Sequence, residues 1–153
     1  MYKKILVPLD GSEFSECALG HVRAIAKGCQ VPEVVLLRVL EPVPNVVYAY
    51  VIDDNLRKNI EKNAQTEFKD YLSKTADSLK RDGIVASIVV VSGQPADAIL
   101  DYTKKNAVDL IIMSTHGRAG LSRWTLGSVA DRVVRHSAAP VLTVSPAGCR
   151  TGK

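Results

Sequence analysis

Short apolar runs rich in β-branched residues alternate along this chain with longer segments of helical periodicity, and this alternation limits the possible folds more than any other feature. Each run is apolar almost throughout, which is typical of strands that are buried on both faces. We therefore predict an α/β fold, a doubly wound five-stranded parallel sheet of order 3-2-1-4-5 with four helices. The predicted strands are 3–9, 33–40, 84–91, 108–113 and 140–144.

Helices are predicted between the strands. Residues 13–27 carry apolar side chains at helical spacing before Gly28, and residues 54–81 do so before Gly83. A third helix is predicted in QPADAILDYTKK, where Pro95 occupies a first-turn position that needs no amide donor. SVADRVVRHS forms the fourth. The side chains expected to face the sheet are Leu56, Ile60, Ala64, Phe68, Leu72, Ala76 and Leu79 from the long helix, and Val129, Val133 and Val134 from the fourth.

The composition fits one globular domain with a substantial core, because the chain has 153 residues and is 46% hydrophobic and 24% charged. We assign residues 1–146 to that domain and residues 147–153 to a mobile C-terminal tail. The net charge is +4, and much of the charge of both signs is interspersed over 53–82, the pattern of a solvated helix face. Only 5% of residues are aromatic, so nucleic-acid binding is not expected.

Cysteine usage and hydropathy indicate a cytoplasmic location. Cys17, Cys29 and Cys149 are odd in number and form no CxxC pair, so neither a disulfide framework nor a zinc site is indicated and reduced thiols are expected. No apolar run approaches the roughly 20 residues of a membrane span, and the N-terminus enters a strand at once. The apolar segment 41–52 is predicted to be a loop that packs over a site or a partner.

The connection after the fourth strand, residues 114–126, is longer than is usual in α/β units. Ligands of such sheets bind beyond the carboxyl ends of the strands, where the strand order reverses. The predicted crevice therefore lies between the residues around Asp10 and the chain that follows Met113. Gly117 and Gly120 allow a close backbone approach to a ligand, and the helix that follows offers amides and a dipole that favour an anion.

Individual residues of this region also have purely structural explanations. Ser128 can donate to a phosphate or bind a phosphate-bound Mg²⁺, but serine is equally preferred as an N-cap, and Gly127 suits a tight turn. Ser12 is predicted to cap the first helix, and Asp10 suits a turn held by its own side chain. Arg118 and Arg123 add positive charge to the connection.

The complete strings carry more information than the single residues. MSTHGRAGLSRWTLGSVADRVVRHSAAPVLTV, preceded by KKILVPLDGSEFSECAL, resembles the ATP-binding branch of the universal stress protein family over essentially the whole chain. The family's phosphate motif is glycine, two residues, glycine, nine residues, then glycine with serine or threonine. Gly117 and Gly127-Ser128 match its spacing. Ser114 replaces the first glycine, which adds a side chain at a backbone contact but also a hydroxyl that can donate.

The resemblance implies roles for single positions. Asp10 matches the acidic residue at the adenine and ribose end, and Val39 the residue whose backbone recognises the adenine edge. Pro8 and Met113 would wall the base, and His116 would shape the loop. The predicted nucleotide-binding residues are Pro8, Leu9, Asp10, Ser12, Val39, Met113, Ser114, His116, Gly117, Arg118, Gly127, Ser128 and Val129.

The function that the resemblance implies is that of a sensor or regulator in a stress response that binds ATP, or AMP or ADP in its place, with or without Mg²⁺. It also implies a homodimer through residues 140–144 and an unidentified downstream protein partner. Slow ATP hydrolysis or phosphoryl transfer is an alternative, although the chain lacks the Walker pattern and no catalytic residue is assigned. A nucleotide-free dimeric interaction module is another. A receiver-like domain phosphorylated on Asp10 is disfavoured, because no acidic cluster accompanies that residue.

Overall fold

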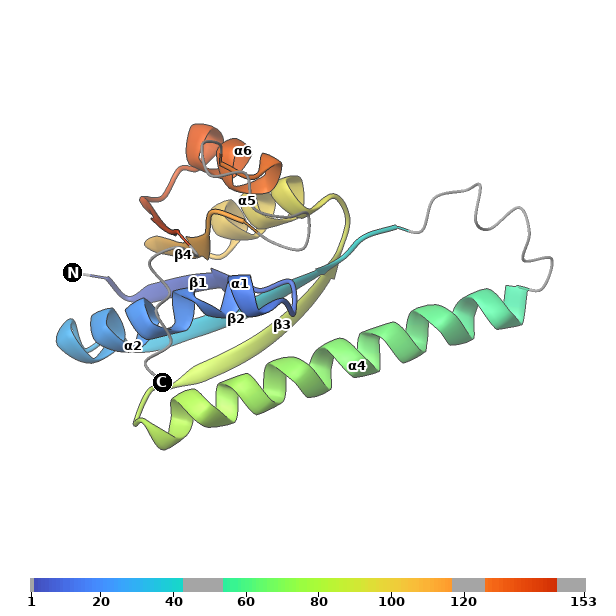
Figure 1. Ribbon diagram of the computed structural model, residues 1–153, viewed down its shortest axis with the longest axis horizontal. Coiled ribbons are helices and arrows are strands. Elements are labelled where there is room, and N and C mark those ends of the chain that lie inside the picture. The colour runs from blue at the N-terminus through green and yellow to red at the C-terminus, as the bar shows by residue number, and fades with distance from the viewer. Residues whose placement is uncertain (1, 43–53, 117–125, 146–153) are drawn as a thin grey trace.

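A computed structural model describes residues 2–42, 54–116 and 126–145 of the chain. Five strands form one parallel sheet with the order β3-β2-β1-β4-β5, which confirms the predicted topology (Figure 1). Each strand begins and ends within two residues of its predicted bounds. The strands are β1 (Lys4–Pro8), β2 (Glu33–Leu40), β3 (Ala86–Ser92), β4 (Leu110–Ser114) and β5 (Val141–Val144).

The helices cover both faces of the sheet. On one face lie α1 (Glu13–Glu16), α2 (Ala18–Gly28) and α4 (Asp54–Arg81), and on the other lie α5 (Pro95–Lys105) and α6 (Ser128–His136). The single helix predicted at 13–27 is divided, because the amide of Cys17 turns back to the carbonyl oxygens of Phe14 and Ser15 and closes the four residues of α1. The chain restarts as α2 at Ala18.

Alternate residues of the strands face two separate core clusters. Leu36 of β2 belongs to the cluster under α2 and α4, whereas Val35 and Leu37 belong to the cluster under α5 and α6. All three side chains are at most 1% exposed. The strands are thus buried on both faces, as their continuous apolar character predicts.

The long helix α4 buries only the second half of its apolar stripe. Leu72, Ala76 and Leu79 are buried as predicted, but Leu56 and Ile60 are 49% and 45% exposed. Figure 1 shows the reason, since the start of α4 projects beyond the sheet while its C-terminal part runs along β2 and β3. The helical period is intact along the whole helix, but the sheet reaches only half of it.

In α6 the inward face is rotated from the predicted one. Val133 is buried, Val129 is half-buried, and Val134 is 43% exposed, so the prediction for Val134 is wrong. Ala130 is buried instead. The buried stripe centres on Val133, and Val134 lies about a quarter turn away from it.

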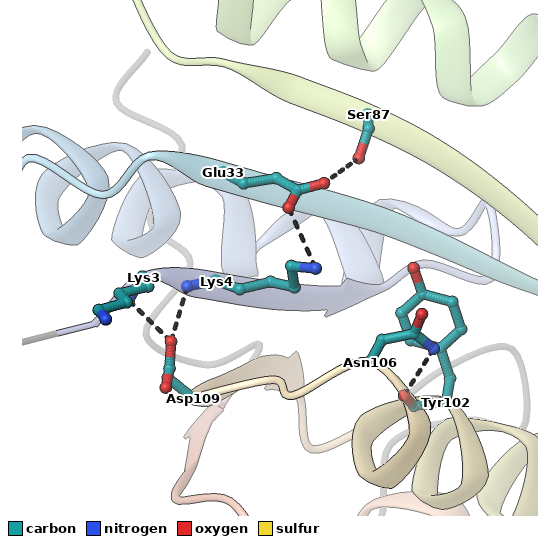
Figure 2. Close-up of polar contacts among 7 residues, drawn as sticks. All are labelled: Lys3, Lys4, Glu33, Ser87, Tyr102, Asn106 and Asp109. Carbon is teal, nitrogen blue, oxygen red and sulfur yellow. Dashed lines mark hydrogen bonds and ion pairs between the residues drawn. The ribbon is translucent and has the colours of Figure 1, made fainter.

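Polar contacts tie the strands together near their amino ends, as Figure 2 shows. Asp109 Oδ2 accepts hydrogen bonds from the backbone amides of Lys3 and Lys4, each at 2.8 Å. These two bonds hold the pKa of Asp109 below its ordinary value. Lys4 Nζ lies 3.2 Å from Glu33 Oε2, and the Ser87 hydroxyl donates to Glu33 Oε1 at 3.2 Å. The contacts therefore connect β1, β2, β3 and the entry to β4.

Other predictions concern the chain as a whole. No helix among the described residues is long and apolar enough to cross a membrane. Cys29 is a free thiol, whereas Cys17 is disulfide-bonded, which differs from the expectation of reduced thiols. The loop predicted at 41–52 lies outside the described residues from residue 43 onward. The division into a domain at 1–146 and a tail at 147–153 stays a prediction.

Candidate functional site

A cleft of about 570 Å³ opens at the carboxyl ends of β1, β2 and β4, beside the start of α6. This is the point where the strand order reverses, because β1 lies between β2 and β4. Most of the predicted site residues line it together: Pro8, Leu9, Asp10, Val39, Met113, Ser114, His116, Gly127, Ser128 and Val129. Ser12 lies behind the lining, in contact with Asp10. Gly117 and Arg118 lie outside the described residues.

The turn between β1 and α1 is held by its own side chains. Asp10 Oδ1 accepts from the Ser12 amide at 2.9 Å and from the Ser12 hydroxyl at 2.5 Å. Ser12 is also the N-cap of α1, since its Oγ accepts from the Ser15 amide at 3.2 Å. The structural explanations of both residues are therefore confirmed. The same bonds fix the Asp10 carboxylate at the wall of the cleft.

The start of α6 is built on a close backbone contact. Gly127 is the N-cap and Ser128 the first helical residue, so the N-cap explanation of Ser128 is wrong. The Gly127 amide donates to the carbonyl oxygen of Thr115 at 2.8 Å, and a Cβ on Gly127 would lie 2.8 Å from that oxygen. Real Cβ atoms do not come so close to a backbone oxygen, so this position requires glycine.

The consequence of a glycine N-cap is an α6 terminus without a side-chain cap. The amides of the first turn, from Ser128 to Ala130, have no acceptor within the helix. They carry the positive end of the helix dipole, and all three residues of this turn line the cleft. A helix N-terminus of this kind suits an anion, phosphate in particular.

At the end of β4 and directly after it, three consecutive polar residues line the cleft. Ser114 is 7% exposed, and its Oγ accepts from the His116 amide at 3.4 Å. The Thr115 hydroxyl lies 2.9 Å from His116 Nδ1. His116 Nε2 is buried with no hydrogen-bond partner in the part of the chain that the structure describes. The Ser114 hydroxyl thus supports the connection from inside, at the position where the motif has its first glycine.

Sequence reasoning missed several residues of the cleft. Arg38 is 5% exposed, and its guanidinium carbon lies 3.7 Å from the centroid of the Phe68 ring. The signal was present in the sequence, because Arg38 is the one charged residue within the apolar run VVLLRVL. The missed residues with polar or aromatic side chains are Ser15, Arg38, Glu41, Phe68, Gln94 and Thr115.

Comparisons with known proteins agree with this architecture. The family model described as the universal stress protein family matches residues 1–145. The universal stress protein MJ0577 of Methanocaldococcus jannaschii is 35% identical, over 94% of this chain and 95% of its own. Its solved structure, described as a structure-based assignment of biochemical function, superposes with a TM-score of 0.75 at 33% identity, covering 95% and 96% of the two chains.

Two further solved structures share the fold and hold nucleotides. A universal stress protein in complex with cAMP has a TM-score of 0.68 at 23% identity, over 94% of this chain and 97% of the other. An Arabidopsis thaliana protein of the same family with AMP bound has a TM-score of 0.66 at 16% identity, over 94% and 91% of the two chains.

Proposed function

Because this chain belongs to the universal stress protein family, we propose that its cleft binds an adenine nucleotide, ATP or in its place AMP or ADP, and that occupancy of the cleft regulates a protein partner in a stress response. The observation that carries the proposal is the uncapped start of α6, where the amides of Ser128 and Val129 meet the cleft. Phosphate oxygens satisfy these donors. Gly117 and Arg118 of the same motif would complete the phosphate site.

The rest of the cleft lining suits a base and a sugar. Pro8, Val39 and Met113 supply apolar walls that match the faces of a purine, and the Asp10 carboxylate can accept from ribose hydroxyls. The family members solved with cAMP and AMP support an adenine nucleotide as the ligand class. A Mg²⁺ ion would belong to the phosphates, where the Ser128 hydroxyl is a suitable oxygen ligand.

We also propose that β5 pairs with a second copy of the chain. β5 is the last strand of the sheet, and an unprotected edge invites another strand. The carbonyl oxygens of Pro140 and Val144 accept from the amides of Ile111 in β4 and of Thr115 directly after it. The backbone groups of Thr143 therefore point to the outer edge of β5. Thr143→Pro should therefore convert dimer to monomer in sedimentation without loss of the fold. A dimer that persists in this variant excludes pairing through β5.

Calorimetric titration of nucleotide-stripped protein with ATP, with and without Mg²⁺, tests the main proposal. We expect one site per chain, and weaker binding of GTP than of ATP. No heat at millimolar ATP, together with no thermal shift, would contradict nucleotide binding and favour a dimeric interaction module. Phosphate release measured in parallel addresses the enzymatic alternative, for which we expect turnover far below the roughly 1 per second of ordinary enzymes. The cytoplasmic location stays a prediction.

A further inference from the structure

Arg38 is a charged residue buried in the wall of the cleft. It follows Leu36 on the face of β2 that packs under α2 and α4, opposite to the face that carries Val39. With 5% of its surface exposed, it belongs to the interior of the protein. Burial of a guanidinium is costly unless neighbouring groups compensate for the lost water.

The guanidinium lies between two elements that are distant in the sequence. On one side is the aromatic face of Phe68 on α4, 3.7 Å from the guanidinium carbon, with the Tyr71 ring centroid at 5.7 Å. On the other side is Gly11, where a Cβ would overlap Arg38 Nη1 and lie 3.2 Å from Cζ. A desolvated cation gains substantially from an aromatic face. The planar group therefore fills the space between α4 and the β1–α1 turn.

Gly11 explains why this space is so narrow. Its φ of +78° lies in the left-handed region, where a side chain is strained, and the lack of a side chain also lets the turn rest against the guanidinium. Gly11 stands between Asp10 and Ser12, whose hydrogen bonds close the same turn. The position of Arg38 thus fixes the turn that carries the Asp10 carboxylate.

A second contact joins the same elements. The Tyr71 hydroxyl of α4 donates to Glu16 Oε1 of α1 at 2.9 Å, and burial, followed by this bond to Glu16, raises the pKa of Tyr71. α4 therefore touches both the turn, through Arg38, and the short helix after it.

We propose that Arg38 is a positioning residue of the nucleotide site, which holds the Asp10–Ser12 turn against α4 through its stack on Phe68. The expected effect of Arg38 on nucleotide affinity rests on the proposed function. The effect on the turn is present without a ligand. Lysine cannot reproduce it fully, because an ammonium group has no flat face to lie between a ring and a backbone.

Hydrogen exchange of the ligand-free protein tests the proposal first. In Arg38→Met we expect the amides of residues 11–15 to exchange about tenfold faster, the effect of one lost interaction of a charged group, while those of β2 and β4 keep their rates. Arg38→Lys should give a smaller change in the same amides. Phe68→Leu should raise the exchange rates of the same amides about as much as Arg38→Met. The double variant should raise them no further than Arg38→Met alone, because both changes remove the same stack of Arg38 on Phe68.

Nucleotide titration of the same variants supplies the second readout. We expect ATP to bind about tenfold more weakly to Arg38→Met, and Lys62→Met, which removes an exposed cation elsewhere on α4, to match the wild type in both measurements. Unchanged exchange at residues 11–15 in both Arg38 variants overturns the proposal, even if ATP binding weakens, because Arg38 would then contact the ligand directly. Faster exchange spread evenly over the sheet also overturns it.

Two outcomes are kept apart by this design. If Arg38→Met does not fold, Arg38→Lys decides through its exchange at residues 11–15. If the wild type binds no nucleotide, the proposed function fails, while the exchange measurements still decide whether Arg38 holds the turn.

Discussion

The amino ends and the carboxyl ends of the strands differ in what their polar groups bind. Near the amino ends of the strands, Asp109 and Glu33 bind groups of neighbouring strands, and the contacts link β1, β2, β3 and the entry to β4. At the carboxyl ends, Gly127 starts α6 with no side-chain cap, and the first turn of that helix faces a cleft. At the amino ends of the strands the hydrogen-bonding groups bind other parts of the fold, whereas at the carboxyl ends the first amides of α6 can donate to a ligand.

The carboxyl ends of the strands have one helix with a side-chain cap and one without. α1 is closed by the Ser12 side chain, but α6 begins at a glycine. Two helices that start at the same end of one sheet therefore differ in the amide donors that a ligand can reach. The position of a helix N-terminus does not by itself make it an anion site. Variants near the amino ends of the strands should therefore change stability alone, whereas variants at the start of α6 should also change nucleotide binding.

The largest effect is expected from Gly127→Ala. The new Cβ must displace the Thr115 carbonyl, so we expect ATP to bind about 100-fold more weakly, or roughly 2.7 kcal/mol, with a loss of stability of about 1–3 kcal/mol. Calorimetry and thermal unfolding measure the two quantities. Gly20→Ala is the matched control, since a Cβ there meets nothing within 4 Å inside a helix. Gly20→Ala should raise stability and leave ATP binding unchanged. Equal losses of ATP affinity and stability in the two variants would contradict the importance of the Gly127–Thr115 contact.

Ser12→Ala should lower stability more than it changes nucleotide binding. It removes the N-cap of α1, which costs about 1 kcal/mol of unfolding free energy, whereas Ser12→Gly should cost only a few tenths. Urea unfolding of the two variants beside the wild type measures the difference. If both variants are as stable as the wild type, α1 does not depend on its cap.

Ser114→Gly restores the glycine of the family motif. We expect ATP affinity to rise about threefold, or roughly 0.6 kcal/mol, because the backbone can approach the nucleotide more closely. Stability should fall slightly, since the hydroxyl that accepts from the His116 amide is lost and glycine weakens a strand. Calorimetry of the variant decides the sign. Weaker binding would instead show that the Ser114 hydroxyl contacts the nucleotide itself.

The smallest effect is expected from Asp109→Ala at the opposite edge. Folding lowers the pKa of Asp109, so its contribution to stability is present at neutral pH and is lost as the pH falls through the folded pKa, below the ordinary value of about 3.9. The variant should unfold at a slightly lower temperature than the wild type at pH 7, and the gap should close in acid. ATP affinity at pH 7 should not change. A gap that stays constant down to the acid limit would contradict the role of the carboxylate.

Much of the fold could be predicted from the sequence because local pattern and tertiary environment agree. β2 and α4 have the predicted bounds, since an apolar run and a long periodic segment each end at clear boundaries. The break at Cys17 was missed because the apolar spacing on either side continues through it. The exposure of Leu56 was missed because periodicity identifies a face of a helix without showing how far the sheet extends beneath it.

The candidate site divides in the same way. Asp10 was predicted from VPLDGS and Gly127 and Ser128 from the glycine motif after the fourth strand, each a continuous string of the sequence, and the cleft brings them together. Arg38 was missed, because its place between Gly11 and Phe68 depends on contacts between elements far apart along the chain. Only the assembled sheet brings these three residues to one point.

The position of β1 at the centre of the sheet has a consequence for synthesis of the chain. β1 can pair with β2 once residue 40 has been made, but its other edge pairs with Leu110 and Ile111 of β4, roughly 70 residues later. At about 5–20 residues per second, the ribosome needs about 4–14 s for that interval. Throughout it, β1 presents an open edge with which another nascent chain can pair. The topology that creates the cleft therefore also sets the period in which a growing chain needs protection.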